Sequence, residues 1–66
     1  MITLPEKLRI LRLRRQLNQE QVADTLGISL RTYGDLERGK RAPSLSLLTK
    51  LAEFYQTDIA ELLERG

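Results

Sequence analysis

The chain has 66 residues, a formal net charge of +2, and neither cysteine nor histidine. A chain of this length forms one domain, near the lower size limit for folding without disulfides or metals. The missing residue types exclude disulfides and thiolate metal sites and remove the commonest proton shuttle and metal ligand. No apolar run approaches membrane-spanning length, and the first residues lack the order of a signal peptide. We therefore expect a soluble, cytoplasmic chain that begins at its native start, with no cofactor, metal, membrane or small-molecule partner.

Charge is unevenly distributed along the chain. Residues 1–15 carry five basic side chains against one acidic, and residues 27–42 carry four basic against two acidic. Residues 16–26 and residues 43–66 each have a net charge of −2. An asymmetric basic surface favours a nucleic-acid partner, although a solvated charged face gives the same pattern. Charge alone leaves both alternatives open.

The first predicted helix starts near the beginning of the chain. Thr3 and Glu6 form a possible capping box, and Pro5 lies in the first turn, where its missing N–H costs nothing. A core stripe follows at helical spacing: Leu4, Leu8 and Leu11, with Leu17 closing the segment.

The second and third predicted helices are joined by a very short turn. Asn18 caps the second helix, and Gln21 completes a capping box. One face of this helix carries Val22, Ala23 and Leu26. Gly27 suits the left-handed conformation at a helix end, and Ser29 caps a third helix that ends before Gly39. Two helices joined so tightly predict a helix-turn-helix, the motif that places its second helix in the DNA major groove.

Two further helices are predicted after a loop from Lys40 to Pro43. Ser44 starts the fourth helix, one face of which carries Leu48, Leu51, Ala52 and Tyr55. Asp58 and Glu61 form another capping box, which opens a short fifth helix through Ile59, Leu62 and Leu63. No segment shows sustained period-two alternation. The sequence therefore predicts an all-α fold, a compact five-helix domain spanning residues 1–66.

The chain resembles the DNA-binding domain of the phage repressor/Cro (Xre-type) helix-turn-helix family over nearly its whole length. The residues that carry the resemblance are Leu8, Leu11-Arg12, Leu17-Asn18-Gln19, Ala23, Leu26-Gly27, Ser29, Leu36-Glu37-Arg38-Gly39-Lys40, Pro43, Leu48, Leu51-Ala52 and Leu62-Leu63. The resemblance implies a sequence-specific regulator of transcription, most simply a repressor, that binds double-stranded DNA. It also implies a homodimer on a palindromic operator, with two recognition helices about 34 Å apart.

The resemblance implies contacts to DNA phosphates from Gln19, Ser29, Thr32, Lys40 and Arg41. Gln19 starts the second helix, where free N–H groups and the helix dipole favour an anion. Ser29 is a cap first and a phosphate contact second. The alternatives are an exposed first turn for Gln19, a solvated side chain for Thr32, and a solvated loop for Lys40 and Arg41.

Base reading is expected from the first turns of the third helix, through Leu30, Arg31, Gly34 and Asp35. Arg31 matches the two acceptors of guanine, and a bidentate contact contributes about 1–3 kcal/mol of discrimination. A salt bridge from Arg31 to Asp35 is the competing interpretation, and both hold if Asp35 orients Arg31. Leu30 can contact only a thymine methyl, and Asp35 could accept from a cytosine. Gly34 lacks a side chain, so either DNA approaches its backbone closely or readout is absent there.

Arg12 and Glu37 match a pair that ties the first helix to the third in several relatives. Such a partly buried salt bridge adds modest net stability, but loss of one partner leaves an unpaired charge. Ordinary surface charges are the alternative for both residues.

Four apolar residues lie off the predicted core stripes: Ile10, Leu13, Leu47 and Phe54. They either widen the small core or form a self-association surface. By the resemblance, the dimer surface lies in the region of the fourth and fifth helices, with Phe54, Ile59 and Glu61 as candidates.

Other classes of function fit the sequence less well. An antitoxin-like protein-binding module uses the same fold, but no added partner-binding segment is visible. Catalysis would depend on carboxylates such as Glu61 and Glu64, without histidine, cysteine or a phosphate-binding loop nearby. An RNA-binding surface would need a stacking platform that the few aromatic residues do not form. The end at Gly66 fits either a complete short regulator or a trimmed domain.

Overall fold

A computed structural model describes residues 2–64, and within this range the chain forms five α-helices and no strand. The helices are α1 (Leu4–Arg14), α2 (Gln19–Leu26), α3 (Leu30–Arg38), α4 (Leu45–Phe54) and α5 (Ile59–Leu63). The predicted all-α, five-helix fold is therefore confirmed. None of the five helices is long and apolar enough to span a membrane.

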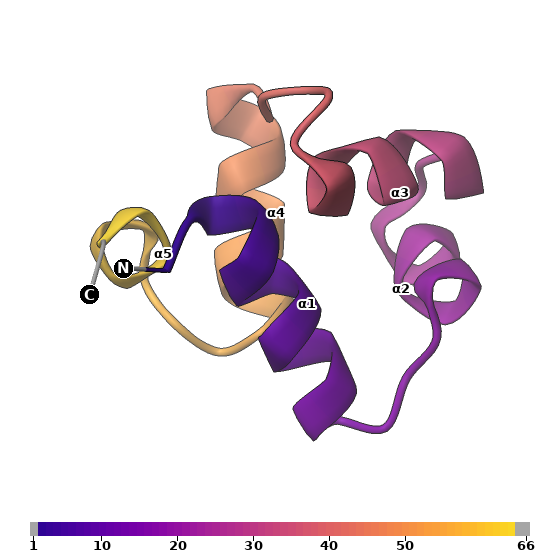
Figure 1. The fold of residues 1–66 in the computed structure, drawn as a ribbon, viewed down its shortest axis with the longest axis horizontal. Helices are drawn as coiled ribbons and strands as arrows, with labels where there is room; N and C mark the ends of the chain where they lie inside the picture. The colour runs from indigo at the N-terminus through magenta and orange to yellow at the C-terminus, as the bar shows by residue number, and fades with distance from the viewer. Residues whose placement is uncertain (1, 65–66) are drawn as a thin grey trace.

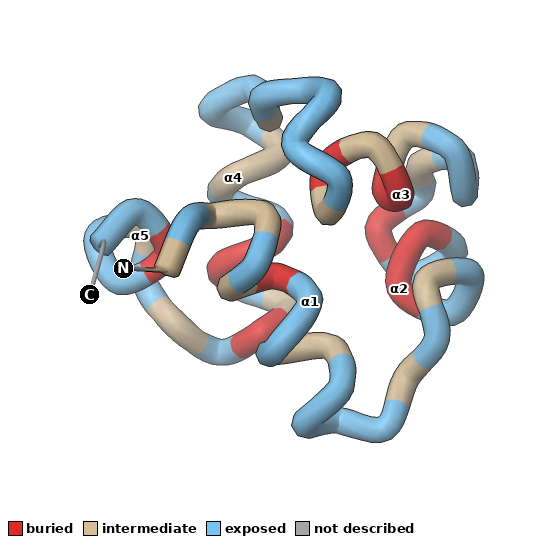
Figure 2. The backbone as a smooth tube through the Cα atoms, viewed as in Figure 1, coloured by how far each residue is buried: buried red, intermediate tan, exposed pale blue. Residues whose placement is uncertain are grey.

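Helix α1 lies between α5 on one side and the α2–α3 pair on the other (Figure 1). It contacts both α3 and α5, while α4 contacts α2 and α5. Helix α3 lies at the edge of this arrangement. Figure 2 shows its middle buried against the other helices, while its first turn and the loop that follows it are exposed. The fold therefore presents the first turn of α3 at the surface.

The core takes buried residues from all five helices and from the turn after α4. These are Leu8, Val22, Ala23, Leu26, Tyr33, Leu36, Leu51, Ala52, Tyr55 and Leu62. The margin of this core is packed by Leu4, Leu11, Leu17, Ile28, Leu47, Leu48, Phe54 and Ile59. The predicted stripes are thus found in the core or at its edge. Leu63 of the predicted fifth helix, by contrast, is 51% exposed.

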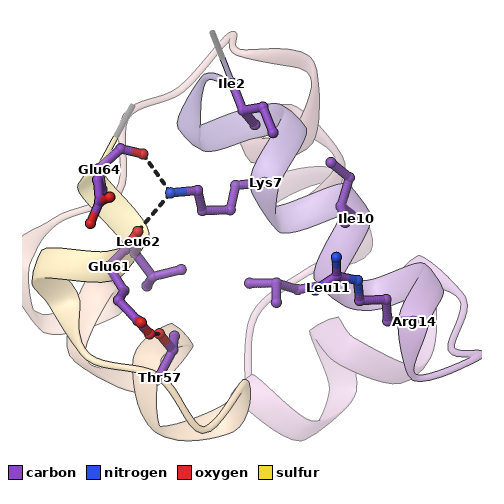
Figure 3. A pocket seen from close by; sticks show the side chains of 9 residues that line it. All are labelled: Ile2, Lys7, Ile10, Leu11, Arg14, Thr57, Glu61, Leu62 and Glu64. Carbon is purple, nitrogen blue, oxygen red and sulfur yellow. Dashed lines mark hydrogen bonds between the residues drawn. The ribbon is translucent and has the colours of Figure 1, made fainter. Parts of the chain in front are cut away.

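The four apolar residues off the stripes divide into two pairs. Leu47 and Phe54 pack against the core, as expected for residues that widen it. Ile10 and Leu13 are exposed, and for them the core-widening prediction was wrong. Ile10 borders an open hollow between α1 and α5 (Figure 3).

Each helix begins at a side-chain cap, as predicted. Asn18 and Gln21 form the complete capping box, with both hydrogen bonds at 2.8 Å. The boxes predicted at Thr3 and Asp58 are only half formed. Both residues accept from the backbone three positions on, but the returning carboxylates of Glu6 and Glu61 accept from threonine hydroxyls instead of the N-cap amide. A nearby hydroxyl donor thus replaces the backbone donor at these two helix starts.

The first four helices end in the same way. After each helix, one residue adopts a left-handed backbone, and the next amide donates to the carbonyl five residues earlier, as in a Schellman motif. Glycine holds the left-handed position after α2, as predicted, and also after α3, with φ of 72° at Gly27 and 75° at Gly39. Glutamine holds it after α1 and α4, with φ of 58° at Gln16 and 54° at Gln56.

Lys7 joins α1 to the C-terminal end of α5. Its Nζ donates to the carbonyl oxygen of Glu61 at 2.7 Å and to that of Glu64 (Figure 3). A cation at this end also complements the helix dipole. An isolated helix of five residues is unstable in water, so α5 depends on this contact and on the burial of Leu62.

Candidate nucleic-acid interface

The turn between α2 and α3 is made by Gly27, Ile28 and Ser29. The Ser29 hydroxyl accepts from the Thr32 amide at 3.0 Å and donates to the Thr32 hydroxyl at 2.8 Å, so it caps α3 as predicted. Ala23 is fully buried, and its small side chain permits the close approach of the two helices. At the start of α3, Leu30 and Arg31 project into solvent, and the side chain of Arg31 is 90% exposed.

The outer face of α3 and the start of α2 line one shallow, open hollow. It is bordered by Gln19, Ser29, Leu30, Arg31, Asp35, Arg38 and Lys40. Six of these seven are among the residues predicted to contact DNA, so the fold brings most of that set together. Thr32 is half-buried beside Ser29, and Arg41 is exposed in the loop after α3. We call the residues of the hollow the α3 face.

The predicted Arg12–Glu37 ion pair is present and nearly buried. Nε of Arg12 donates to Oε2 of Glu37 at 2.7 Å, and Nη2 donates to Oε1 at 3.0 Å. The remaining terminal nitrogen donates to the carbonyl of Leu17 at 2.9 Å. The two side chains are only 11% and 3% exposed. This bidentate pair joins α1 to α3 and also holds the segment between α1 and α2.

Gln19 is drawn into the same cluster. Its side-chain amide donates to Oε1 of Glu37 at 3.1 Å, and the residue is half-buried. Gln19 is therefore more than an exposed first-turn residue, because its side chain is hydrogen-bonded to α3. One amide hydrogen of Gln19 remains for another acceptor, at a helix N-terminus where backbone N–H groups also point outward.

Two buried tyrosines extend this cluster beneath the α3 face. The hydroxyls of Tyr33 and Tyr55 are 2.6 Å apart and hydrogen-bonded. Burial raises the pKa of both tyrosines, and the hydrogen bonds of Tyr33 raise its pKa further. Burial opposes ionisation of Glu37, but the hydrogen bonds from Arg12 and Gln19, together with the nearby Tyr33 hydroxyl, outweigh it and lower the pKa of Glu37. The hydrogen bond to Glu37 likewise raises the pKa of Arg12. The cluster is therefore charged, paired and fixed.

Asp35 pairs with two arginines, the expected Arg31 and also Arg38. Nη2 of Arg38 donates to Oδ1 of Asp35 at 2.7 Å, whereas Nε of Arg31 lies 4.0 Å from Oδ2. The hydrogen bond from Arg38 is the main reason that the pKa of Asp35 is lowered. The predicted Arg31–Asp35 ion pair is therefore present but long, and it leaves the Arg31 side chain exposed, whereas the shorter hydrogen bond holds Arg38.

Gly34 is buried even though it has no side chain, because the guanidinium of Arg38 covers it. A Cβ atom at Gly34 would lie 2.9 Å from Nη1 of Arg38. The surface above Gly34 is thus occupied by the Arg38 side chain. The alternatives expected from the sequence were only a close approach of DNA to the Gly34 backbone or an absence of readout there. The prediction of site residues missed Arg38, although a glycine four residues before an arginine on one helix was a visible signal.

The candidate dimer residues lie away from the α3 face, on α4 and α5. Phe54 and Ile59 are half-buried against the core, and the Glu61 carboxylate accepts from the Thr57 hydroxyl. The Phe54 ring meets Tyr55 edge-on, with ring centroids 4.9 Å apart, and the Arg15 guanidinium lies 5.8 Å from the Phe54 centroid.

A family model described as helix-turn-helix matches residues 8–62. The chain belongs to this helix-turn-helix family. The matched range runs from the buried Leu8 of α1 to the buried Leu62 of α5, so the helix-turn-helix match includes the core as well as α2 and α3. The family resemblance seen in the sequence is thereby confirmed.

Several regulators are similar to this helix-turn-helix chain. The cryptic phage CTXphi transcriptional repressor RstR of Vibrio cholerae is 47% identical over 57 residues, which cover 86% of this chain and 51% of RstR. The HTH-type transcriptional regulator AnsR of Bacillus subtilis is 40% identical over 60 residues, covering 91% of this chain and 52% of AnsR. The uncharacterized HTH-type transcriptional regulator MJ0272 of Methanocaldococcus jannaschii is 37% identical over 59 residues, which cover 89% of each protein. The chain spans about half the length of the first two relatives.

Proposed function

We propose that this chain is a sequence-specific double-stranded DNA-binding domain of a transcriptional repressor, with α3 in the major groove. The observation that carries the proposal is the α3 face, where an exposed Arg31 lines one hollow together with Gln19 at the start of α2 and Lys40 after α3. Relatives named as transcriptional repressors and regulators support the same function.

The charges around α3 suit a polyanion. Both carboxylates of this segment are paired with arginines, Asp35 with Arg38 and Glu37 with Arg12. Lys40 and Arg41 take part in none of the ion pairs among the described residues. The cations that remain are therefore available for phosphates, whose neutralisation supplies much of the affinity of such proteins.

Phosphate contacts and base contacts have separate sources in this proposal. Gln19, Lys40 and Arg41 hold the DNA backbone near the C-terminal end of α3, with Ser29 and Thr32 as further contacts at its start. Arg31 places its planar fork against guanine, and Leu30, 48% exposed, contacts a thymine methyl. Phosphate contacts then set the position of the helix, while base contacts set the sequence.

We further propose that the chain acts in the cytoplasm as a homodimer on a palindromic operator, with residues 1–66 as one domain. Phe54, Ile59 and Glu61 are the candidate dimer contacts, and the exposed Leu63 adds apolar surface beside them. They lie on helices other than the helix-turn-helix pair, so two copies could pair without covering the α3 face.

Selection from a random double-stranded DNA library at near-physiological salt tests this function. We expect a two-fold symmetric motif, with one guanine position lost in Arg31→Ala because its bidentate contact is removed. The matched control is Arg9→Ala, which removes the same charge from an exposed position on α1. Recovery of no motif, or equal loss in both variants, would contradict the proposal.

A further inference from the structure

Arg38 is the last residue of α3, yet its guanidinium lies over the middle of that helix. Side chains of a helix tilt toward its N-terminus, so a residue covers the surface about one turn before its own Cα. Here the surface so covered is Gly34, whose missing Cβ leaves the space that the guanidinium occupies. Arg38 thereby places a charged group at the position where α3 lacks a side chain.

Asp35 fixes the guanidinium in this place. Its Oδ1 accepts from Nη2 of Arg38 at 2.7 Å, and this bond uses only one of the five N–H donors of the side chain. The others remain for a second acceptor. Arg38 borders the same hollow as Leu30 and Arg31, and Gln19 and Lys40 line it as well.

The ion pair makes Arg38 better suited to bases than to phosphates. An arginine already neutralised by a carboxylate gains little from a further anion, but its remaining donors still match the directional acceptors O6 and N7 of guanine. Asp35, which alone would repel DNA, is compatible with the groove because Arg38 neutralises it.

We propose that Arg38 is a base-reading residue of this chain, and that Gly34 and Asp35 are positioning residues that hold its guanidinium against a guanine. The inference rests on the proposed function. It moves readout at the middle of α3 from Gly34 and Asp35 themselves to an arginine one turn further along.

The test measures affinity for the selected operator and for each of its single-base-pair variants at fixed salt. The proteins are the unmodified chain, Arg38→Ala, Gly34→Ala, the double variant Gly34→Ala with Arg38→Ala, and Arg38→Lys. We expect the first two variants to lose about tenfold discrimination at one shared base pair. Lysine keeps the positive charge but lacks the planar set of guanidinium donors, so Arg38→Lys is expected to lose this discrimination as well.

The double variant separates positioning from direct contact. If Gly34 acts only through Arg38, adding Gly34→Ala to Arg38→Ala changes nothing further. Gly34→Ala must also melt no lower than the unmodified chain, because alanine favours the helix and only the flexible end of Arg38 has to move.

Three results would overturn the inference. Arg38→Ala could weaken all sequences equally and reduce the salt dependence, which is the behaviour of a phosphate contact. Gly34→Ala could cost the same with and without Arg38, which would mean that DNA itself approaches Gly34. Selection of no motif by the unmodified chain would overturn the proposed function as well, and so is distinguishable from the other two.

Discussion

Glu37 is the residue on which three helices depend. It lies on α3 and accepts hydrogen bonds from Arg12 of α1 and from Gln19 of α2. Its side chain is 3% exposed, so no solvent replaces a lost partner. Removal of one partner of such a buried pair costs far more than the pair contributes in net stability. Glu37 is therefore a structural residue that holds the α3 face in position.

The pH dependence of stability follows from this arrangement. Hydrogen bonds hold the pKa of Glu37 below its usual value of 4.5. A lowered pKa means that the stabilisation is fully present above about pH 4.5 and is lost as pH falls through the folded-state pKa. We expect Glu37→Gln to lower the free energy of unfolding by about 3 kcal/mol at neutral pH.

Urea denaturation from pH 7 to pH 2 checks this prediction. The difference between the unmodified chain and Glu37→Gln should shrink across the acid range. Glu20→Gln, which changes an exposed carboxylate on α2, is the matched control and should differ little at any pH. A constant difference between Glu37→Gln and the unmodified chain down to pH 2 would contradict the account.

For single residues, the sequence predicts ion pairs better than it predicts hydrogen-bond networks. The Arg12–Glu37 pair was expected from the family pattern, but nothing in the spacing shows that Gln19 joins it. Asp35 had an arginine within helical reach on each side, four residues before it and three after. Both pair with Asp35, and the missing side chain at Gly34 leaves room for Arg38 to fold back and make the shorter contact.

For the helices as elements, the residues with left-handed backbones determine where each helix stops. Gly27 and Gly39 adopt left-handed backbones without a steric penalty, whereas Gln16 and Gln56 adopt nearly the same conformation with a Cβ. That conformation costs an L-residue with a side chain about 1–2 kcal/mol. The connections after α1 and α4 therefore carry local strain that those after α2 and α3 lack.

Replacing the glutamine should relieve this strain. We expect Gln16→Gly to stabilise the chain by about 0.5–1 kcal/mol, since the greater flexibility of glycine in the unfolded chain offsets part of the gain. In a domain of this size, that corresponds to a rise in melting temperature of roughly 3–6 °C. Thermal denaturation followed by circular dichroism measures it.

Gln16→Ala is the control for this substitution. Alanine keeps the Cβ and therefore the strain, so it should not raise the melting temperature. An equal rise for alanine and glycine would show that the conformation at residue 16 is not the cause.

The same contrast shows which parts of the fold are predictable. Glycines and cap residues mark the ends of α2 and α3 in the amino-acid sequence itself, because each has a conformational reason to be there. Glutamine carries no such signal, so the ends of α1 and α4 could not be placed from sequence. The exposure of Ile10 and Leu63 was also hidden, because periodicity shows which residues share a face but not whether a neighbour covers it.

In the whole molecule, the arrangement of the helices separates two surfaces, the α3 face and the hollow between α1 and α5. The α3 face lies beside α2, while the hollow between α1 and α5 lies on the other side of α1 (Figures 1 and 3). The described part of the chain measures 27 × 24 × 22 Å, so one face of this kind is a large share of its surface. A net charge of only +2 does not reveal the α3 face, because its cationic character depends on which carboxylates are paired with arginines.

The most direct test of the central claim is amide chemical-shift mapping by NMR. The labelled chain would be titrated with its selected operator and with a duplex of scrambled sequence. We predict large, operator-dependent shifts at the start of α2, along α3 and at Lys40 and Arg41, with small shifts around Ile10 on α1. Shifts concentrated around the hollow between α1 and α5, with α3 unchanged, would contradict the assignment of α3 as the DNA-reading helix.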